Sequence, residues 1–405
     1  MQSGLFRQVS AHEGNGQWAE QIRRMAPIYK KTNDIRSQFA RDYTRILHST
    51  AYRRLKSKTQ VFFAARHDHI CTRIEHVNHV ASVSYTIAKY LGLNTELTNA
   101  IAIGHDLGHA PFGHAGEEFL KKIVKEELGA NFWHERNSLR FVDKCETLPD
   151  SEGIERNLDL TYAVRDGIVC HCGEVDENSI FPRTEAFDLY SIEKSSQCAP
   201  FTWEGCVVKI ADKISYLGRD IEDALLLGIL TDSEIRELVK IGREFGVIKA
   251  NEITNTLLMH DFIIDLCRTS SPGKGIAFSP QYLDLINALK AFNYRYIYRH
   301  ERLNLYKRYA QLVVESIYQT LRDAYRGTDT VAQLRRYKDM YPSLAKGFSQ
   351  WLLKYARAED RAAKYQNEVL YSLEKRQDYI QAIVDYISSM SDHFAIASFN
   401  EITTF

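Results

Sequence analysis

The stretch IEHVNHVASVSYTIAKYL, residues 74–91, decides the fold class of this chain. Its apolar residues recur every three or four positions, so side chains such as Val77, Val80 and Ile87 share one helical face. Gly92 follows directly, and glycine suits the left-handed conformation in which many helices end. The spacing therefore predicts an amphipathic helix over residues 74–91.

Two further stretches carry the same helical spacing. Residues 94–106 predict a second helix, and residues 201–227, which include CVVKIADKISYLGRDIEDALLL, predict a third. Only 8 Pro and 21 Gly interrupt the 405 residues, and the alternation typical of strands is scarce. We therefore expect an all-α protein.

The composition narrows the class of protein. Hydrophobic residues make up 44% and charged residues 26%, as is usual for soluble globular chains, and Lys plus Arg equals Asp plus Glu at 52 each. A polyanionic partner would therefore need a local basic cluster. We see no secretory signal and no apolar run of about 18 residues, so we expect a cytoplasmic protein without membrane contact. The seven cysteines are expected to be reduced thiols.

Histidines are the least evenly distributed residues. Six of the 14 lie between positions 76 and 134, three of them in GHDLGHAPFGHAGE. Adjacent His105 and Asp106 can face one divalent ion if they lie near a helix end. His76 and Asp212 are candidates for the other ligands, because an unpaired ionisable group on an apolar helical face is costly.

The pattern of a His, a His–Asp pair and a later Asp resembles the HD hydrolase superfamily. Six blocks, in order and at similar spacing, further resemble the deoxyguanosine triphosphate triphosphohydrolase family: RILHSTAYRRLKSKTQVF (45–62), TRIEHV (72–77), GHDLGHAPFGHAGE (104–117), FWHERNSLR (132–140), RDGIVCHCG (165–173) and KIADKISYLGRDIEDA (209–224). Ala110 replaces a common proline and IEH replaces the commoner LTH, but neither change removes a functional atom. The resemblance implies an HD-domain helical core with an additional C-terminal helical lobe.

The resemblance also implies the cofactor and the reaction. It assigns one divalent metal ion to His76, His105, Asp106 and Asp212, and such a ligand set accepts manganese, magnesium, iron, nickel or zinc. The implied reaction hydrolyses a deoxynucleoside triphosphate, dGTP or several dNTPs, to the deoxynucleoside and inorganic tripolyphosphate.

This reaction needs a proton donor for the departing 5′ oxygen. His114 and Glu117 lie three residues apart, so they share one face if a helix begins near Gly113. The glutamate can then orient and charge the imidazole. Members of the similar family carry a His and an acid at these positions, and we expect His114 to be the catalytic acid, supported by Glu117.

The substrate contacts are predicted partly from charge and partly from the resemblance. Arg73, on the helical face of His76, and Lys213, beside Asp212, suit the charge of a triphosphate. His109 and His134 are expected around the phosphates, and the family position of Gln60 contacts the 3′ hydroxyl. An aromatic ring under C2′ would exclude a 2′ hydroxyl. The full set of predicted substrate-binding residues is Gln60, Arg73, His109, His134, Lys213, Tyr216, Asp220, Tyr294 and Tyr298.

We expect three parts in the chain. Residues 1–60 form an N-terminal helical segment that contributes to the site, residues 61–230 form the HD catalytic core, and residues 231–405 form a helical lobe that completes the pocket and supports oligomers. The resemblance implies a homo-oligomer, a hexamer or a tetramer. The basic run RRLKSK, residues 53–58, predicts a solvated face, and leaves a regulatory nucleotide or single-stranded nucleic acid open as a partner.

Two other functions stay open. One is an HD phosphodiesterase or nucleotidase, which is disfavoured by the cations suited to a triphosphate and by the lack of a GYP block after an HD pair. The other is a nucleotide-sensing or nucleic-acid-binding protein without turnover, which is disfavoured by the intact His and Asp set. Cys170, His171 and Cys172 do not predict a zinc site, because three consecutive helical residues cannot all reach one tetrahedral ion.

Overall fold

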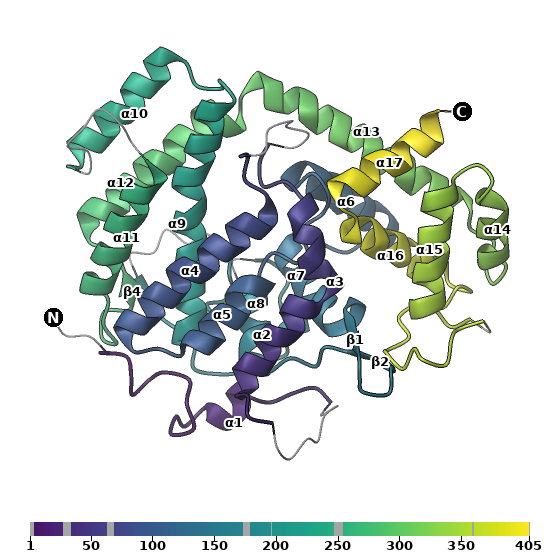
Figure 1. Ribbon diagram of the computed structural model, residues 1–405, viewed down its shortest axis with the longest axis horizontal. Coiled ribbons are helices and arrows are strands. Elements are labelled where there is room, and N and C mark those ends of the chain that lie inside the picture. Colours follow the sequence, from purple (N-terminus) through teal and green to yellow (C-terminus); the bar gives the residue numbers. More distant parts are fainter. Residues whose placement is uncertain are drawn as a thin grey trace.

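The structure is a computed structural model, and it describes residues 4–26, 34–62, 69–172, 179–195, 197–246, 254–358 and 360–404. Within these ranges the chain is mainly helical, with two small two-stranded sheets, which confirms the predicted all-α class (Figure 1). Gly173, at the end of one quoted block, lies outside the described residues. None of the described helices combines the length and the apolar character needed to span a bilayer.

The first part of the chain, up to residue 226, contains the first group of described helices. Their bounds are α1 (Trp18–Gln21), α2 (Gln38–His48), α3 (Thr50–Arg54), α4 (Arg73–Leu91), α5 (Thr95–Gly104), α6 (His114–Leu128), α7 (His134–Arg140), α8 (Tyr162–Val169) and α9 (Trp203–Leu226). The later helices are α10 (Asp232–Glu244), α11 (Asn255–Thr269), α12 (Pro280–Phe292), α13 (Glu301–Asp323), α14 (Thr330–Tyr337), α15 (Pro342–Tyr355), α16 (Arg376–Ser389) and α17 (Asp392–Thr403).

Shorter elements join these helices. Two are 3-10 turns and two are π-helical turns: η1 (Leu55–Ser57), η3 (Leu189–Ser191), η2 (Phe141–Cys145) and η4 (Asn293–Tyr298). The strands pair antiparallel, β1 (Thr147–Pro149) with β2 (Glu155–Asn157) and β3 (Ser179–Ile180) with β4 (Ile276–Ala277).

Local chemistry at both ends explains α4. The side chains of Thr72 and Glu75 form a capping box at its start, and Gly92 ends it with a φ of 82°, as predicted. The face that carries Val77 and Val80 is fully buried. The helix begins one residue before the predicted range, so that Arg73 becomes its first residue.

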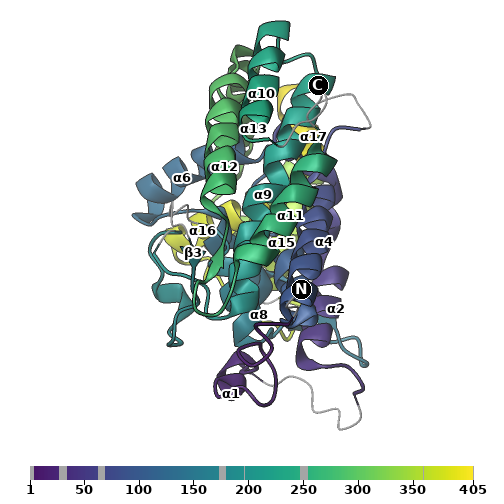
Figure 2. The ribbon, with the colours of Figure 1, turned by 90° about the vertical axis from the view of Figure 1, so that its left-hand side faces the viewer.

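The second and third predicted helices pack against α4. The observed α5 and α9 contact α4 and each other (Figure 1), while α11 and α12 lie alongside α9 (Figure 2). Gly104 ends α5 two residues before the predicted limit, and a Cβ there would approach the Ile168 side chain to 2.6 Å. His105 and Asp106 therefore leave the helix at its carboxyl end, in a closely packed turn.

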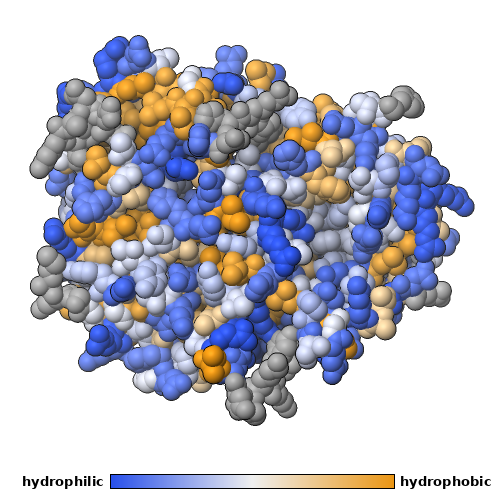
Figure 3. Space-filling view, viewed as in Figure 1, coloured by the Kyte–Doolittle hydropathy of each residue, from blue (hydrophilic) through white to orange (hydrophobic). Residues whose placement is uncertain are grey.

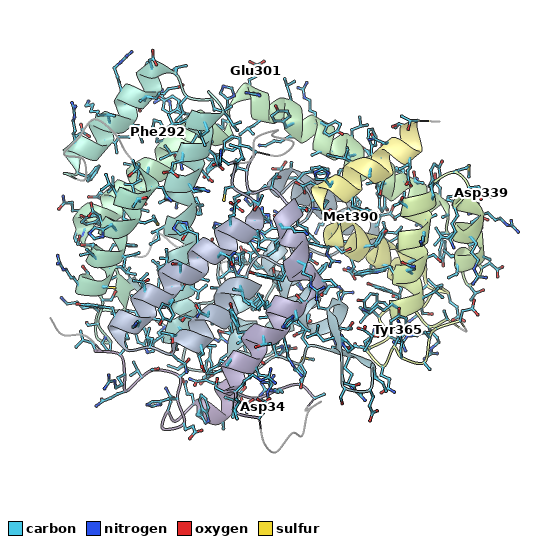
Figure 4. All side chains as sticks on the ribbon, in the orientation of Figure 1. Asp34, Phe292, Glu301, Asp339, Tyr365 and Met390 are labelled. Atoms are coloured by element: carbon cyan, nitrogen blue, oxygen red, sulfur yellow. The ribbon has the colours of Figure 1, made fainter. Side chains whose placement is uncertain are left out.

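Two buried apolar clusters divide the interior. The first joins α2, α4, α5, α8, α9, α11 and α12, and includes Phe292; the second joins α6, α13, α15 and α16, and includes Met390 (Figure 4). Although α6 lies early in the sequence, it packs on α13 and α16, which begin 187 and 262 residues after the start of α6. The predicted division at residues 60 and 230 stays a prediction.

The predicted solvated face at residues 53–58 is wrong at Lys58. Its side chain is buried, and its Nζ donates to the carbonyl of Ser388 at 2.8 Å and to the carbonyl of His109. Burial lowers the pKa of Lys58 well below its ordinary value. Arg53 and Lys56 are exposed as predicted, so the run is only partly a solvent-facing surface.

Candidate active site

Four side chains from three segments converge into what we call the buried His/Asp group: His76, His105, Asp106 and Asp212. His76 comes from α4, the His–Asp pair follows α5, and Asp212 comes from α9. His76 Nε2 lies 2.9 Å from Asp212 Oδ1. His105 Nε2 lies 3.4 Å from Asp106 Oδ1 and 3.7 Å from Asp212 Oδ1. The structure thus places the four predicted metal ligands in one cluster, in which the ligand atoms of His76, His105 and Asp212 all lie within 4.8 Å of one another and Asp106 contacts His105.

The geometry of this group fits a divalent ion. The ring of His105 is held through Nδ1, which lies 2.6 Å from the carbonyl oxygen of Ala102, so its Nε2 faces the carboxylates. That Nε2 is buried and has no hydrogen-bond partner among the described residues. A buried polar atom without a partner costs free energy, and metal coordination would remove that cost. Two imidazoles with two carboxylates suit a divalent first-row metal.

The charge state of the group also suits metal binding. Burial by itself would raise the pKa of Asp212, but the hydrogen bond from His76 and the neighbouring charges lower it to about 2. A carboxylate must be ionised to bind a metal, so this side chain is ready at neutral pH.

Arg73 and His109 extend the buried His/Asp group. Arg73 is buried, and its Nη1 lies 2.8 Å from Asp106 Oδ2. His109 Nε2 lies 3.1 Å from Asp106 Oδ1. Burial and the nearby charges of Arg73 and His134 lower the pKa of His109, which keeps its ring neutral.

A second set of side chains, which we call the rim group, consists of His114, Glu117 and His134. His114 is the first residue of α6, and its side chain is 73% exposed. Its Nδ1 lies 3.5 Å from Oε2 of the buried Glu117. The same oxygen lies closer to His134, 3.2 Å from its Nδ1, while Lys121 approaches the other oxygen to 3.1 Å. Glu117 therefore contacts two imidazoles, those of His114 and His134, and not only that of His114 as predicted.

Electrostatics keep the buried part of the rim group charged. Burial alone would lower the pKa of His134, but Glu135 and Glu117 raise it to about 9. Burial would raise the pKa of Glu117, but hydrogen bonds from His114 and His134 hold it well below the ordinary range. The ring of His134 stacks on that of His109, with ring centroids 3.8 Å apart. Contacts thus run continuously from the rim group to the buried His/Asp group.

A pocket of about 420 Å³ opens beside the rim group. A volume of this size and a mainly apolar lining with a few polar groups are typical of small-molecule sites. Six predicted residues line it: Gln60, His114, Tyr216, Asp220, Tyr294 and Tyr298. The other lining residues are Val61, Phe112, Ala115, Cys172, Leu303 and Lys307.

Four predicted substrate-binding residues lie outside this lining. Arg73, His109 and His134 occupy the buried region between the pocket and the metal ligands. Lys213 follows Asp212 on α9 and is half-buried. Their predicted phosphate contacts stay predictions.

A short hydrogen bond joins Tyr298 and Asp220 in one wall of the pocket. The sequence predicted both as substrate contacts but did not predict that they contact each other. Tyr298 Oη donates to Asp220 Oδ2 at 2.5 Å. Burial raises the pKa of Asp220 to about 7, so its carboxyl group titrates near neutral pH. The Tyr298–Asp220 pair is therefore a polar contact in the pocket whose carboxyl group can be neutral or ionised near neutral pH.

Asp392, at the start of α17, was missed by sequence reasoning. Its Oδ1 accepts a hydrogen bond from the Phe112 backbone N–H at 2.9 Å, and its Oδ2 accepts from the Thr59 backbone N–H at 3.0 Å. Phe112 has a φ of 64°, which is uncommon for a residue with a Cβ, and Gly113 follows with 58°. The buried carboxylate thus joins the segment before Gln60 to the turn that precedes His114.

The three residues from Cys170 to Cys172 have different neighbours. Cys170 Sγ lies 3.5 Å from Cys198 Sγ, and the ring of His171 packs against that of His105. Cys172 Sγ lies 3.7 Å from Nε2 of His134. The described cysteines are all free thiols, as predicted. His79 is half-buried and belongs to none of the metal-compatible groups found among the described residues.

The helical fold and the buried His/Asp group together define an HD-domain phosphohydrolase. The chain matches the HD domain over residues 73–217 and the phosphohydrolase-associated domain over residues 276–338. It is 31% identical to a deoxyguanosinetriphosphate triphosphohydrolase-like protein of Caldanaerobacter subterraneus subsp. tengcongensis, over 91% of this chain and 86% of that relative. A protein of the same description from Nitrosomonas europaea is 30% identical, over 93% of each chain.

The chain therefore belongs to the deoxyguanosinetriphosphate triphosphohydrolase-like family. Its coarse function follows from this membership: it is a hydrolase of the nucleotide phosphohydrolase type. HD domains are metal-dependent, and the buried His/Asp group provides residues that could bind the ion.

Proposed function

We propose that this protein hydrolyses deoxynucleoside triphosphates, dGTP or several dNTPs, to the deoxynucleoside and inorganic tripolyphosphate. One observation carries the proposal: the pocket beside His114 is connected to the buried His/Asp group through His134 and His109, which are stacked at 3.8 Å. A nucleotide whose base and sugar occupy the pocket would direct its phosphates along this path.

The four side chains of the buried His/Asp group would hold the metal, as the unpaired Nε2 of His105 supports. When bound, a divalent ion supplies Lewis-acid activation of the phosphate and of water, whether it is manganese, magnesium, iron, nickel or zinc. Arg73, already paired with Asp106, would meet the first phosphate. His134, which stays protonated at neutral pH, and Lys213 would neutralise the rest of the tail.

His114 would deliver the proton to the departing 5′ oxygen. Its imidazole lines the pocket and is exposed enough to meet a substrate, while Glu117 lies within 3.5 Å and can orient it. A bound nucleotide would cover this exposed ring and remove it from water, which strengthens its interaction with the carboxylate.

The sugar and the base would occupy the rest of the pocket. Gln60 is proposed for the 3′ hydroxyl and Tyr216 for the face of the sugar at C2′. Tyr294, whose ring is more than half exposed, and the pair of Tyr298 and Asp220 are proposed as contacts of the base.

Assembly, location and further partners belong to the proposal as well. We propose that residues 1–60, 61–230 and 231–405 are the functional parts of the chain, that it assembles as a hexamer or tetramer, and that it acts in the cytoplasm. Apolar residues gather where α9 ends near α10 (Figure 3), and Leu226 in the last turn of α9 is half exposed. This surface supports association between copies of the chain. A regulatory nucleotide or single-stranded nucleic acid remains a further proposed partner.

Product analysis tests the reaction. The purified protein is incubated with each of the four dNTPs and with several divalent ions, and the products are separated by ion-exchange chromatography. We expect a deoxynucleoside and tripolyphosphate in equal amounts, and no products from a His105→Ala variant. Release of orthophosphate, or of a nucleoside monophosphate, would contradict the proposal and indicate a different phosphohydrolase.

A further inference from the structure

We infer that Cys170 and Cys198 form an oxidation-sensitive thiol pair, which hydrogen peroxide converts into a reversible disulfide that weakens metal binding in the buried His/Asp group. The two sulfur atoms lie 3.5 Å apart, although the residues are 28 positions apart in the sequence. The inference does not rest on the proposed function, because neither cysteine lines the pocket and its test needs no substrate.

The fold holds the two cysteines together at the ends of two linked segments. Cys170 directly follows α8, and Cys198 lies in the segment that leads into α9. Arg183 bridges these segments, because its Nη2 lies 2.5 Å from Oδ1 of Asp166 on α8 and its Nη1 donates to the carbonyl of Ala199 at 2.9 Å. The contact between the sulfurs is therefore supported by the surrounding backbone.

The distance between the sulfurs is short enough for a bond to form. A disulfide bond is about 2.0 Å long, so the two sulfur atoms would have to approach each other by about 1.5 Å. Rotation of a cysteine side chain from one staggered position to another moves its sulfur by more than this distance. Closing the pair therefore needs side-chain rotation and only small shifts of the backbone.

The two thiols differ in the way that a two-step oxidation requires. Cys198 is half-buried, so a small oxidant can reach it, whereas Cys170 is buried. The hydrogen bond from Cys170 lowers the pKa of Cys198 against the opposing effect of burial, and the charges of Arg183 and Lys209 add to the lowering. The same hydrogen bond and burial raise the pKa of Cys170. Because the thiolate is the nucleophile, Cys198 attacks the oxidant first.

Hydrogen peroxide is the two-electron oxidant of the pair. The Cys198 thiolate attacks one peroxide oxygen and the O–O bond breaks, which gives a sulfenic acid and a hydroxide that takes a proton to become water. The Cys170 sulfur then attacks the sulfenic sulfur, the S–O bond breaks, and the S–S bond forms. The Cys170 proton leaves with this second hydroxide as water. Two thiols and one peroxide thus give one disulfide and two waters, and a small-molecule thiol reverses the step by exchange.

The pair adjoins a direct neighbour of the buried His/Asp group. His171 follows Cys170, and its ring packs against that of His105 with ring centroids 4.8 Å apart. Lys209 Nζ donates to the carbonyl of Cys172 at 2.5 Å and to that of Cys170 at 3.4 Å, so these three consecutive residues are held as one unit. A disulfide that moves Cys170 would therefore shift the ring beside His105.

Peptide mapping and metal binding on the purified full chain test the inference. The protein is treated with hydrogen peroxide, the remaining thiols are alkylated, and tandem mass spectrometry of the digest locates the links. We expect a Cys170–Cys198 link that dithiothreitol removes. Titration with Mn²⁺, followed by electron paramagnetic resonance of the free ion, should show affinity about tenfold weaker in the linked protein, as is usual when the surroundings of a metal ligand change.

Two variants separate this pair from the other thiols. Cys198→Ser should form no link and keep its Mn²⁺ affinity after peroxide treatment. Cys267→Ser removes a buried thiol on α11 and should behave like the wild type. The inference is overturned if the wild type forms no link or joins Cys198 to Cys172 instead. It is also overturned if the linked protein binds Mn²⁺ as tightly as the reduced protein, or if peroxide weakens Mn²⁺ binding equally in Cys198→Ser.

Discussion

The buried His/Asp group and the rim group use the same residue types for different chemistry. In the buried group the side chain of His105 is fully inaccessible, and its Nε2 has no hydrogen-bond partner among the described residues, so a divalent ion could bind there. In the rim group Glu117 already pairs with two imidazoles and a lysine, and His114 remains 73% exposed. Both groups contain close contacts between imidazoles and carboxylates, but an unpaired buried nitrogen suits metal coordination, whereas an exposed imidazole beside a buried carboxylate suits proton transfer.

The largest effect is expected from a change in the buried His/Asp group. His105→Ala should remove bound metal and reduce hydrolysis to the background level, because the remaining three ligands cannot hold the ion in place. Metal analysis and product chromatography measure the result, and far-ultraviolet circular dichroism should show an unchanged helical fold.

His79→Ala is the matched control for this prediction. His79 lies one turn after His76 on α4 but outside the group, and burial lowers its pKa to about 4, so it is neutral. The variant should keep the metal and most of the activity. Full turnover by metal-free His105→Ala protein would disprove the assigned role of the group.

The next effect is expected in the rim group. His114→Ala should leave the metal content and the KM nearly unchanged while kcat falls by about 10² to 10⁴, the usual contribution of a general acid. Steady-state kinetics at saturating metal provide the test. Lys121→Ala, which removes an exposed contact of Glu117, should change kcat by less than tenfold. An unchanged kcat in the His114→Ala variant would exclude His114 as the acid.

Glu117→Gln tests the electrostatic difference between the two groups. The pKa of His134 is raised from 6.5 to about 9, so its pairing stabilises the fold fully below pH 6.5 and loses this effect as the pH rises through 9. The pKa of Glu117 is lowered, so its contribution is present above its ordinary value of 4.5. Wild type and variant should therefore differ most between about pH 5 and 6.5.

The size of this difference should be about 1–3 kcal/mol, because one charge of a buried pair is removed while His134 remains. Denaturant unfolding across pH 5 to 10 measures the free energy of unfolding for both proteins. A difference that stays constant above pH 9 would show that Glu117 acts by packing and not by charge.

The smallest effect is expected away from both groups, at the contact that joins the pocket walls. Asp392→Asn keeps the shape of the side chain. It replaces the carboxylate that accepts hydrogen bonds from two backbone N–H groups with an amide. We expect a loss of about 1–2 kcal/mol in stability and a several-fold higher KM, with metal retained. Asp339→Asn, an exposed site on the C-terminal lobe (Figure 4), should change neither quantity.

Much of the fold could be predicted from short-range patterns. The predicted helix over residues 74–91 is observed as Arg73–Leu91, and that over residues 201–227 as Trp203–Leu226. The helix over residues 94–106 ends earlier, at Gly104, where a Cβ would approach Ile168 of α8 to 2.6 Å. Spacing predicts a helix well, but it places the ends of a helix only to within one or two residues.

The candidate site, too, was predicted only in part from the sequence. The spacing of His114 and Glu117 predicted their shared face, but only the fold brings His134 closer to that carboxylate than His114 is. The sequence predicted that Lys58 is exposed, because basic runs usually face solvent. The fold instead buries this side chain, which donates to the carbonyl of His109.

By itself, the sequence determined the all-α class, the family and the side chains able to bind a metal, since periodicity and motif chemistry are written in nearby residues. Only the tertiary structure decided which carboxylate each imidazole contacts, that Asp392 closes the pocket wall and that Cys172 meets His134. The contacts of His134 with Glu117, of Cys172 with His134 and of Asp392 with Phe112 join residues 17, 38 and 280 positions apart. Their geometry depends on how whole helices pack, and no local pattern encodes that packing.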